Sequence, residues 1–142
     1  MSETKSQQRS FRLTTSTTQL IDRIADRQPR SRNDLVERML AEAVRLEDHP
    51  IISFRTGGNG TRRACVAGSR LDVLDVVATF LASGRDRTTT IEHFVHVPER
   101  HVIAALDYYA DFTEELDAAL AERRVRDDDI AGTLRRRDEV HG

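Results

Sequence analysis

Three histidines and one glutamate lie close together in the sequence, and their types could suggest metal chemistry: Glu92, His93, His96 and His101. Their spacing is neither that of a zinc-protease helix nor that of a Cys/His zinc finger. His96 also precedes the helix that Pro98 is expected to open, so it would not share a helix face with His93. We interpret these histidines as ordinary polar or half-buried residues and expect no bound metal.

Three other stretches also lack a catalytic arrangement. The segment Gly57 to Gly60 has no Gly-Lys-Ser/Thr ending, so a hairpin turn is a better interpretation than a phosphate-binding loop. The acids Asp127 to Asp129 lie in an arginine-rich tail with no scaffold to bring them together. The single cysteine, Cys65, is expected to be a small buried strand residue. We therefore expect no enzyme activity and no cofactor. A small metal-dependent enzyme is the contrary hypothesis, and stoichiometric metal in elemental analysis would support it.

Near the start of the chain, residues 9–15 alternate polar and apolar side chains with a period of two. This pattern predicts an amphipathic strand whose apolar face carries Phe11 and Leu13. The opposite face carries three candidate DNA-binding residues: Ser10, Arg12 and Thr14. A two-stranded ribbon fits the major groove of B-DNA, where arginine can bond guanine and hydroxyl groups can contact several bases. An ordinary edge strand with a solvated polar face is the alternative.

Two helices are predicted after this strand. The first covers residues 17–27 and is interrupted by Gln28-Pro29-Arg30, because proline cannot continue the hydrogen-bond ladder. Ser31 can cap the second helix, which His49-Pro50 ends. The first amides of a helix lack intrahelical partners, and the helix dipole is positive there, so a phosphate is a favoured ligand. The candidate phosphate-binding residues are Ser31, Arg32 and Asn33.

A lone strand leaves its backbone groups unpaired, and nothing else in residues 1–49 can supply a partner strand. We therefore expect a homodimer in which two copies of the strand pair about a two-fold axis. Strand, helix, break and then Arg30-Ser31-Arg32-Asn33-Asp34 at a helix start resembles the ribbon-helix-helix family of dimeric repressors and antitoxins, over about residues 9–46. The resemblance implies that alternate strand residues enter the DNA groove and that the second helix presents its first amides to a phosphate.

Residues 50–122 are predicted to form a β-hairpin followed by three helices. The expected elements are strands at 51–56 and 61–67, a helix from an Asp72 cap to Gly84, a short helix opened by a Thr89/Glu92 capping box, and a long helix from Pro98 through Leu120. The expected fold class is thus mainly α, with an N-terminal ribbon-helix-helix module followed by a hairpin and a three-helix, homeodomain-like module.

The second module also carries a resemblance. The stretch from Arg63 to Val76, then Leu81-Ala82-Ser83-Gly84 and the stretch from Val102 to Tyr109, is similar to the domain-of-unknown-function family four-three-three. The similarity spans roughly residues 52–120, although Ser69 replaces the usual threonine. It implies a small homeodomain-like helical unit of the kind whose genes commonly lie beside toxins with PIN-like nuclease folds. The basic hairpin region could contact phosphate non-specifically, and a solvated or partner-binding face is an equally good interpretation. Its arginines are Arg55, Arg62, Arg63 and Arg70.

Charge is segregated along the chain, although the formal net charge is only −2. Residues 91–122 carry one arginine against eight acidic residues, which would repel DNA. Residues 123–142 form a charged tail that is expected to be marginal alone and to fold on a partner. Its arginines are the candidate toxin-binding residues: Arg123, Arg124, Arg126, Arg135, Arg136 and Arg137.

No apolar run approaches the length of a membrane span and no secretory signal is present, so we expect a cytoplasmic protein without a membrane partner. We predict the antitoxin of a type II toxin-antitoxin pair, which binds operator DNA as a homodimer or higher even oligomer and represses its own operon. Its acidic helix or tail would cover a PIN-like ribonuclease toxin, or its arginines would enter the toxin's acidic metal site. The alternative is a stand-alone transcriptional regulator whose second module only mediates oligomerisation.

Overall fold

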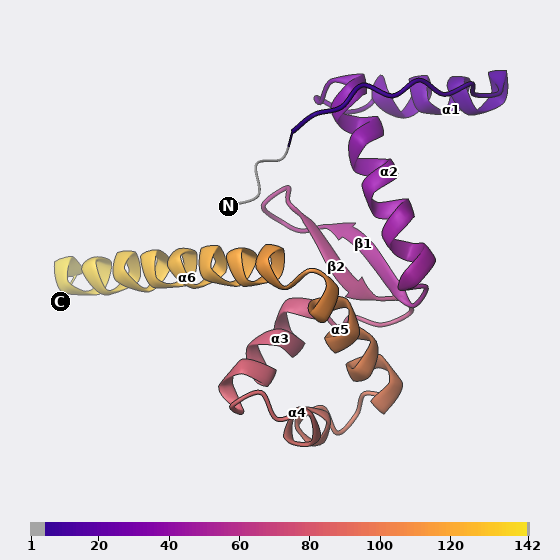
Figure 1. Ribbon diagram of the computed structural model, residues 1–142. Helices are drawn as coiled ribbons and strands as arrows, with labels where there is room; N and C mark the ends of the chain where they lie inside the picture. Colours follow the sequence, from indigo (N-terminus) through magenta and orange to yellow (C-terminus); the bar gives the residue numbers. More distant parts are fainter. Residues whose placement is uncertain (1–4, 142) are drawn as a thin grey trace. The chain divides into compact units, whose positions relative to one another are not determined.

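The structure is a computed structural model that describes residues 5–141, and in this part of the chain helices predominate (Figure 1). The described residues form six helices and one two-stranded antiparallel sheet. The chain divides into an N-terminal unit, residues 1–44, and a C-terminal unit, residues 45–142. The boundary falls inside the second helix, whereas the sequence suggested a boundary after residue 49.

The N-terminal unit contains helix α1 (Thr15–Ala25) and most of helix α2 (Arg32–Asp48). Both predicted helices are confirmed, and so is the Ser31 cap, because the Asp34 amide donates to the Ser31 hydroxyl at 3.1 Å. Helix α1 begins two residues before the predicted Thr17, because Thr14 caps it by accepting a hydrogen bond from the Thr17 amide. Residues 9–14 have no regular secondary structure in the single chain. A strand is defined by its pairing, and the described chain offers these residues no partner strand.

The C-terminal unit opens with the predicted hairpin. Strand β1 (Ile52–Thr56) pairs antiparallel with strand β2 (Arg62–Val66), with Ile52 opposite Val66 and Thr56 opposite Arg62. The four-residue stretch that begins at Gly57 forms the turn, and Gly60 adopts a φ of +80°, which glycine accepts without a steric penalty. The interpretation of this stretch as a turn is therefore confirmed.

Two helices follow the hairpin, and the structure corrects one of their caps. Helix α3 (Val73–Ala82) has the predicted Asp72 cap and ends before Gly84, which has a φ of +72°. Helix α4 (Arg87–His93) is capped by Asp86, whose carboxylate accepts from the Thr89 amide at 2.9 Å. The expected capping box at Thr89 is therefore wrong. The Asp86 carboxylate, three residues before Thr89, satisfies the free amides first, and this places Thr89 inside the helix.

The long helix expected from Pro98 is two helices in the structure. Helix α5 (Glu99–Asp111) stops at Phe112, whose φ of −127° is not helical, and helix α6 (Thr113–His141) then runs to the end of the described chain (Figure 1). The C-terminal unit therefore has four helices after the hairpin in its described part, rather than three. Residues 123–141 are also helical in the single chain, as the C-terminal part of α6. That this segment is marginal alone and folds on a partner stays a prediction.

The hydrophobic core of the C-terminal unit lies between the hairpin and helices α3, α5 and α6. Tyr108 and Tyr109 are buried in it, and Leu116 and Leu120 attach the start of α6. Cys65 is also buried in β2. Its burial is the main cause that raises the pKa of its thiol, and the nearby Asp72 carboxylate raises the pKa further. The neutral thiol supports a packing role. Among residues 5–141, no helix combines the length and apolar character needed to cross a bilayer.

Candidate nucleic-acid and protein interfaces

The predicted base-contacting residues lie in the exposed segment before α1. Ser10 and Arg12 are fully available in the single chain, and both are exposed. Thr14 differs, because its hydroxyl already accepts from the Thr17 amide and donates to the Thr17 hydroxyl at 2.9 Å. Thr14 therefore orients the start of α1 in this structure, and Ser10 and Arg12 are the freer candidates for base contacts.

The apolar residues of the N-terminal unit are unusually exposed. Phe11 is 74% exposed and Leu13 is 54% exposed, and they alternate along the chain with Ser10 and Arg12. Helix α1 contributes no buried residue at all. Three further large apolar side chains of the unit are exposed by half or more: Leu20, Leu40 and Val44. These side chains supply apolar surface that the single chain leaves uncovered.

The predicted phosphate-binding residues lie at the start of α2. Ser31 caps the Asp34 amide, and the Leu35 amide bonds to the Ser31 carbonyl, so the amides of Arg32 and Asn33 precede the first helical bond. The Arg32 guanidinium forms an exposed ion pair with Asp22 of α1, at 3.0 Å. This contact fixes the side chain beside the break between the two helices. The exposed Asn33 side chain remains available to a ligand.

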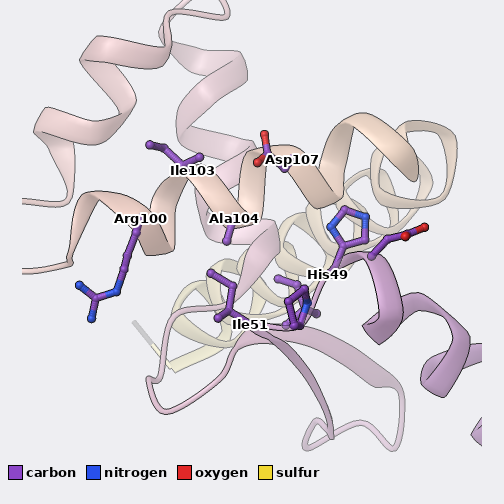
Figure 2. A pocket seen from close by; sticks show the side chains of 9 residues that line it. His49, Ile51, Arg100, Ile103, Ala104 and Asp107 are labelled. Atoms are coloured by element: carbon purple, nitrogen blue, oxygen red, sulfur yellow. The ribbon is translucent and has the colours of Figure 1, made fainter.

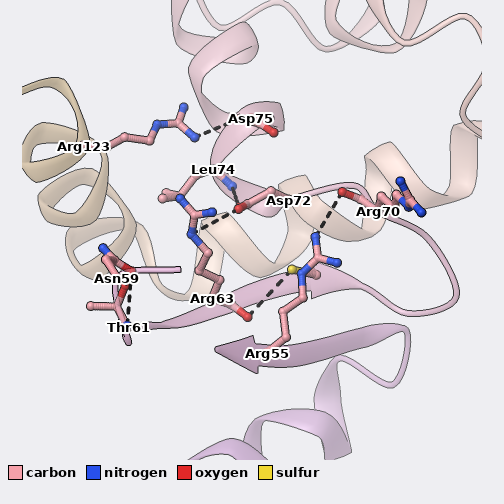
Figure 3. Close-up of polar contacts among 10 residues, drawn as sticks. Arg55, Asn59, Thr61, Arg63, Arg70, Asp72, Leu74, Asp75 and Arg123 are labelled. Atoms are coloured by element: carbon pink, nitrogen blue, oxygen red, sulfur yellow. Dashed lines mark hydrogen bonds and ion pairs between the residues drawn. The ribbon is translucent and has the colours of Figure 1, made fainter. Parts of the chain in front are cut away.

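The hairpin arginines make internal contacts in the C-terminal unit (Figure 3). Arg63 lies 3.6 Å from Asp72, whose other carboxylate oxygen accepts from the Leu74 amide. Arg55 donates to the Arg70 carbonyl at 3.2 Å. These contacts connect the hairpin to the segment that leads into α3. Arg55 and Arg63 therefore have a structural role, and no phosphate contact is needed to explain their presence.

The six tail arginines separate into two groups. Arg123 donates to Asp75 of α3 at 2.8 Å and is only 21% exposed, so it holds α6 against the core (Figure 3). The other five project from the exposed part of α6: Arg124, Arg126, Arg135, Arg136 and Arg137. Only these five are available to a partner in the observed structure.

A polar cluster that the sequence did not indicate joins the end of α2 to α5 and α6. Arg45 donates to the Tyr108 hydroxyl at 2.8 Å and to both carboxylate oxygens of Glu115, and its guanidinium lies 4.1 Å from the centre of the Phe112 ring. Burial acts to lower the pKa of Arg45, but the bonds to Glu115 and Tyr108 outweigh it and raise the pKa. Arg45 and Glu115 are far apart in sequence, so no local pattern could have paired them.

A shallow pocket of about 390 Å³ lies between the end of α2, the start of the hairpin and α5 (Figure 2). It is lined mainly by apolar groups, including Ile51, Ile103 and Ala104. Figure 2 shows that Arg100 and Asp107 point in different directions, and His49 bonds instead to Asp111, at 2.7 Å. The polar groups therefore do not converge on a common ligand position.

Within the part of the chain that the structure describes, no three His, Cys, Asp or Glu side chains are arranged to hold a metal ion. The His93 ring instead packs edge-on against Phe94. Comparisons of the chain with protein-family models, with curated proteins and with solved structures found no match. The two family resemblances therefore rest on the sequence motifs alone.

Proposed function

We propose that the protein is the antitoxin of a type II toxin-antitoxin pair, with an N-terminal unit that dimerises and binds operator DNA. The observation that carries the proposal is the exposure of Phe11 and Leu13 directly before two helices. These two apolar side chains alternate along the segment with the polar side chains of Ser10 and Arg12. An isolated chain leaves this apolar face in water. A second copy can cover it and leave the polar face outward.

Exposed apolar side chains supply a driving force for dimerisation. Full burial of one large apolar side chain stabilises a protein by roughly 1.5–3 kcal/mol, and each copy offers several exposed ones in its N-terminal unit. Pairing of the two segments also satisfies their backbone amides and carbonyls, which no described strand can do. The helices α1 and α2 supply the rest of the surface against which the paired segments would pack.

The paired segments would present two copies of Arg12 on one face, related by the two-fold axis of the dimer. Arginine can form two bonds to one guanine in the major groove, and a serine hydroxyl can assist at the neighbouring position. The start of α2 adds the unpaired amides of Arg32 and Asn33, which favour a phosphate oxygen. Base contact and phosphate contact then come from adjacent parts of one small unit.

The toxin-binding part of the proposal concerns the five exposed arginines of α6. A PIN-like ribonuclease has an acidic metal site, and a guanidinium group is a suitable competitor for its carboxylates. Arg123 is left out of this set because it is engaged with Asp75. Replacement of all five by alanine is expected to abolish neutralisation of the toxin encoded by the neighbouring gene. Full neutralisation by that variant would contradict this part of the proposal.

The DNA-binding part is tested with purified protein and the DNA upstream of its own gene, at about 50 mM and about 200 mM salt. Arg12→Ala should weaken specific binding by about 1–3 kcal/mol and relax the base preference. Arg9→Ala is the matched control, because Arg9 loses the same charge but belongs to the other face of the alternating segment. Equal effects of the two substitutions, or equal binding of unrelated DNA, would exclude specific base contact by this segment.

A further inference from the structure

Helix α6 carries one continuous seam of residues with the spacing of a coiled coil. The seam residues follow one another at alternating intervals of four and three: Leu116, Leu120, Arg123, Asp127, Ile130, Leu134 and Arg137. This alternation keeps all seven on one side of the helix. The first two are buried in the core and Arg123 is engaged with Asp75. The seam therefore serves the C-terminal unit at one end and continues past it at the other.

The continuation of the seam has no partner in the described chain. Ile130 is 60% exposed and Leu134 is 55% exposed, although both occupy the side of the helix that is buried earlier in α6. Neither Asp127 nor Arg137 has an ion-pair partner among the described residues. A solvent-exposed helix of this length, with Gly132 in its interior, gains little from its own backbone bonds. It needs a surface to pack against.

A second copy of the same helix is complementary to this seam when it runs in the opposite direction. In the antiparallel register centred on residue 132, Ile130 lies opposite Leu134 of the second copy. In the same register Asp127 lies opposite Arg137, and the two-fold axis repeats each contact. Two apolar layers are thus enclosed by an ion pair at each end.

The flank of the seam is complementary in the same register. Arg124 and Asp138 are the residues that directly follow seam positions Arg123 and Arg137, so they take equivalent flanking positions. In an antiparallel pair such positions face one another, and an arginine then meets an aspartate on both sides of the axis. A parallel pair would instead place Asp127 beside Asp127 and Arg137 beside Arg137, which is repulsive.

We infer that residues 124–138 of α6 form a self-association site, which pairs antiparallel with the same segment of a second copy of this chain. The contact is short, so it is weak alone and becomes effective where another contact already holds two copies together. It involves a different surface from the DNA-binding segment and stands whether or not that segment binds DNA. It uses Arg124 and Arg137, and leaves Arg126, Arg135 and Arg136 outside the seam.

The test is disulfide cross-linking of the full chain. An equimolar mixture of Ile130→Cys and Leu134→Cys chains should cross-link at least about tenfold faster than Val125→Cys chains, because tethering raises the local concentration of the two thiols. Val125 is the matched control, since it is also 60% exposed but lies on the opposite side of the same helix. The natural cysteine, Cys65, is buried and does not compete.

Charge reversal then tests the register. Asp127→Arg added to both cysteine chains should slow cross-linking to the rate of the control, because arginine then faces arginine. Asp127→Arg in one chain and Arg137→Asp in the other should restore the fast rate, because both ion pairs form again: one keeps its wild-type residues, and the other has its charges exchanged. Cross-linking no faster than that of Val125→Cys overturns the site itself. The antiparallel register is overturned if Ile130→Cys chains cross-link fastest with one another. It is also overturned if the charge reversals leave the cross-linking rates unchanged.

Discussion

At the scale of single residues, Arg45 connects three elements of the C-terminal unit. Its guanidinium bonds to Glu115 and to the Tyr108 hydroxyl and packs over Phe112. We predict that Arg45→Met lowers the free energy of unfolding by about 2 kcal/mol, because methionine keeps the stacking volume but not the hydrogen bonds. Urea unfolding measures the change. Glu122→Ala, at an exposed position of α6, is the control and should change the free energy by less than about 0.5 kcal/mol.

Tyr109 gives a pH dependence whose sign follows from its environment. Its burial raises the pKa of the phenol, and the bond that its hydroxyl donates to Asp117 at 2.6 Å raises the pKa further. The folded state therefore favours the neutral phenol. Its contribution to stability is complete below the unfolded pKa of about 10 and is lost as the pH rises through the higher folded pKa.

We predict that Tyr109→Phe is less stable than the wild type by about 1 kcal/mol at neutral pH and that this difference shrinks above about pH 10. Thermal unfolding of both proteins across this range measures the difference. The raised pKa of the Cys65 thiol acts in the same direction but is common to both proteins, so it cancels in the comparison. A difference that grows with pH would contradict the assignment.

At the scale of elements, the Asp72 cap decides where α3 begins. Its carboxylate accepts from the Leu74 amide at 2.9 Å and lies 3.6 Å from Arg63, which is itself partly exposed. A cap contributes about 1 kcal/mol, whereas a long and partly solvated ion pair contributes less. We therefore predict that Asp72→Ala destabilises the protein by about 1–2 kcal/mol and that Asp72→Asn costs clearly less, since asparagine also caps helices. Equal losses in urea unfolding would assign the effect to the ion pair instead.

The helices and the hairpin followed from sequence patterns because their signals are local. Ser31 and Asp72 are good capping residues at the right positions, and Gly84 takes the left-handed conformation that ends α3. The break at Phe112 has no such signal, since apolar residues recur at helical spacing on both sides of it. The ion pair of Arg123 with Asp75 could not be predicted from the sequence either, because it depends on how α6 packs against α3.

The candidate DNA-binding segment shows a different limit. Phe11 and Leu13 are recognisable from the period of two, yet a strand needs backbone partners, and the single chain supplies none among its described residues. The sequence therefore indicates a surface whose final structure depends on a second molecule. The same holds for Ile130 and Leu134, whose spacing matches buried residues earlier in α6 although they are exposed.

At the scale of the whole molecule, the two units differ in how complete their cores are. The C-terminal unit buries most of its large apolar residues between the hairpin and its helices. In the N-terminal unit, Leu35 is the one buried apolar residue within the described part, and α1 contributes none. The stability of the N-terminal unit should therefore depend on association, whereas the core of the C-terminal unit should not.

This difference is measurable with one substitution and hydrogen exchange. We predict that Phe11→Asp removes protection from the backbone amides of α1 and leaves the amides of α5 protected, because the added charge blocks coverage of the apolar face that α1 needs. Ser10→Asp is the matched control: it adds the same charge to the polar face of the same segment, so it should weaken DNA binding and retain protection of α1. If α1 were equally protected in Phe11→Asp and wild type, the N-terminal unit would be stable without a second copy, and the exposed face would need another occupant.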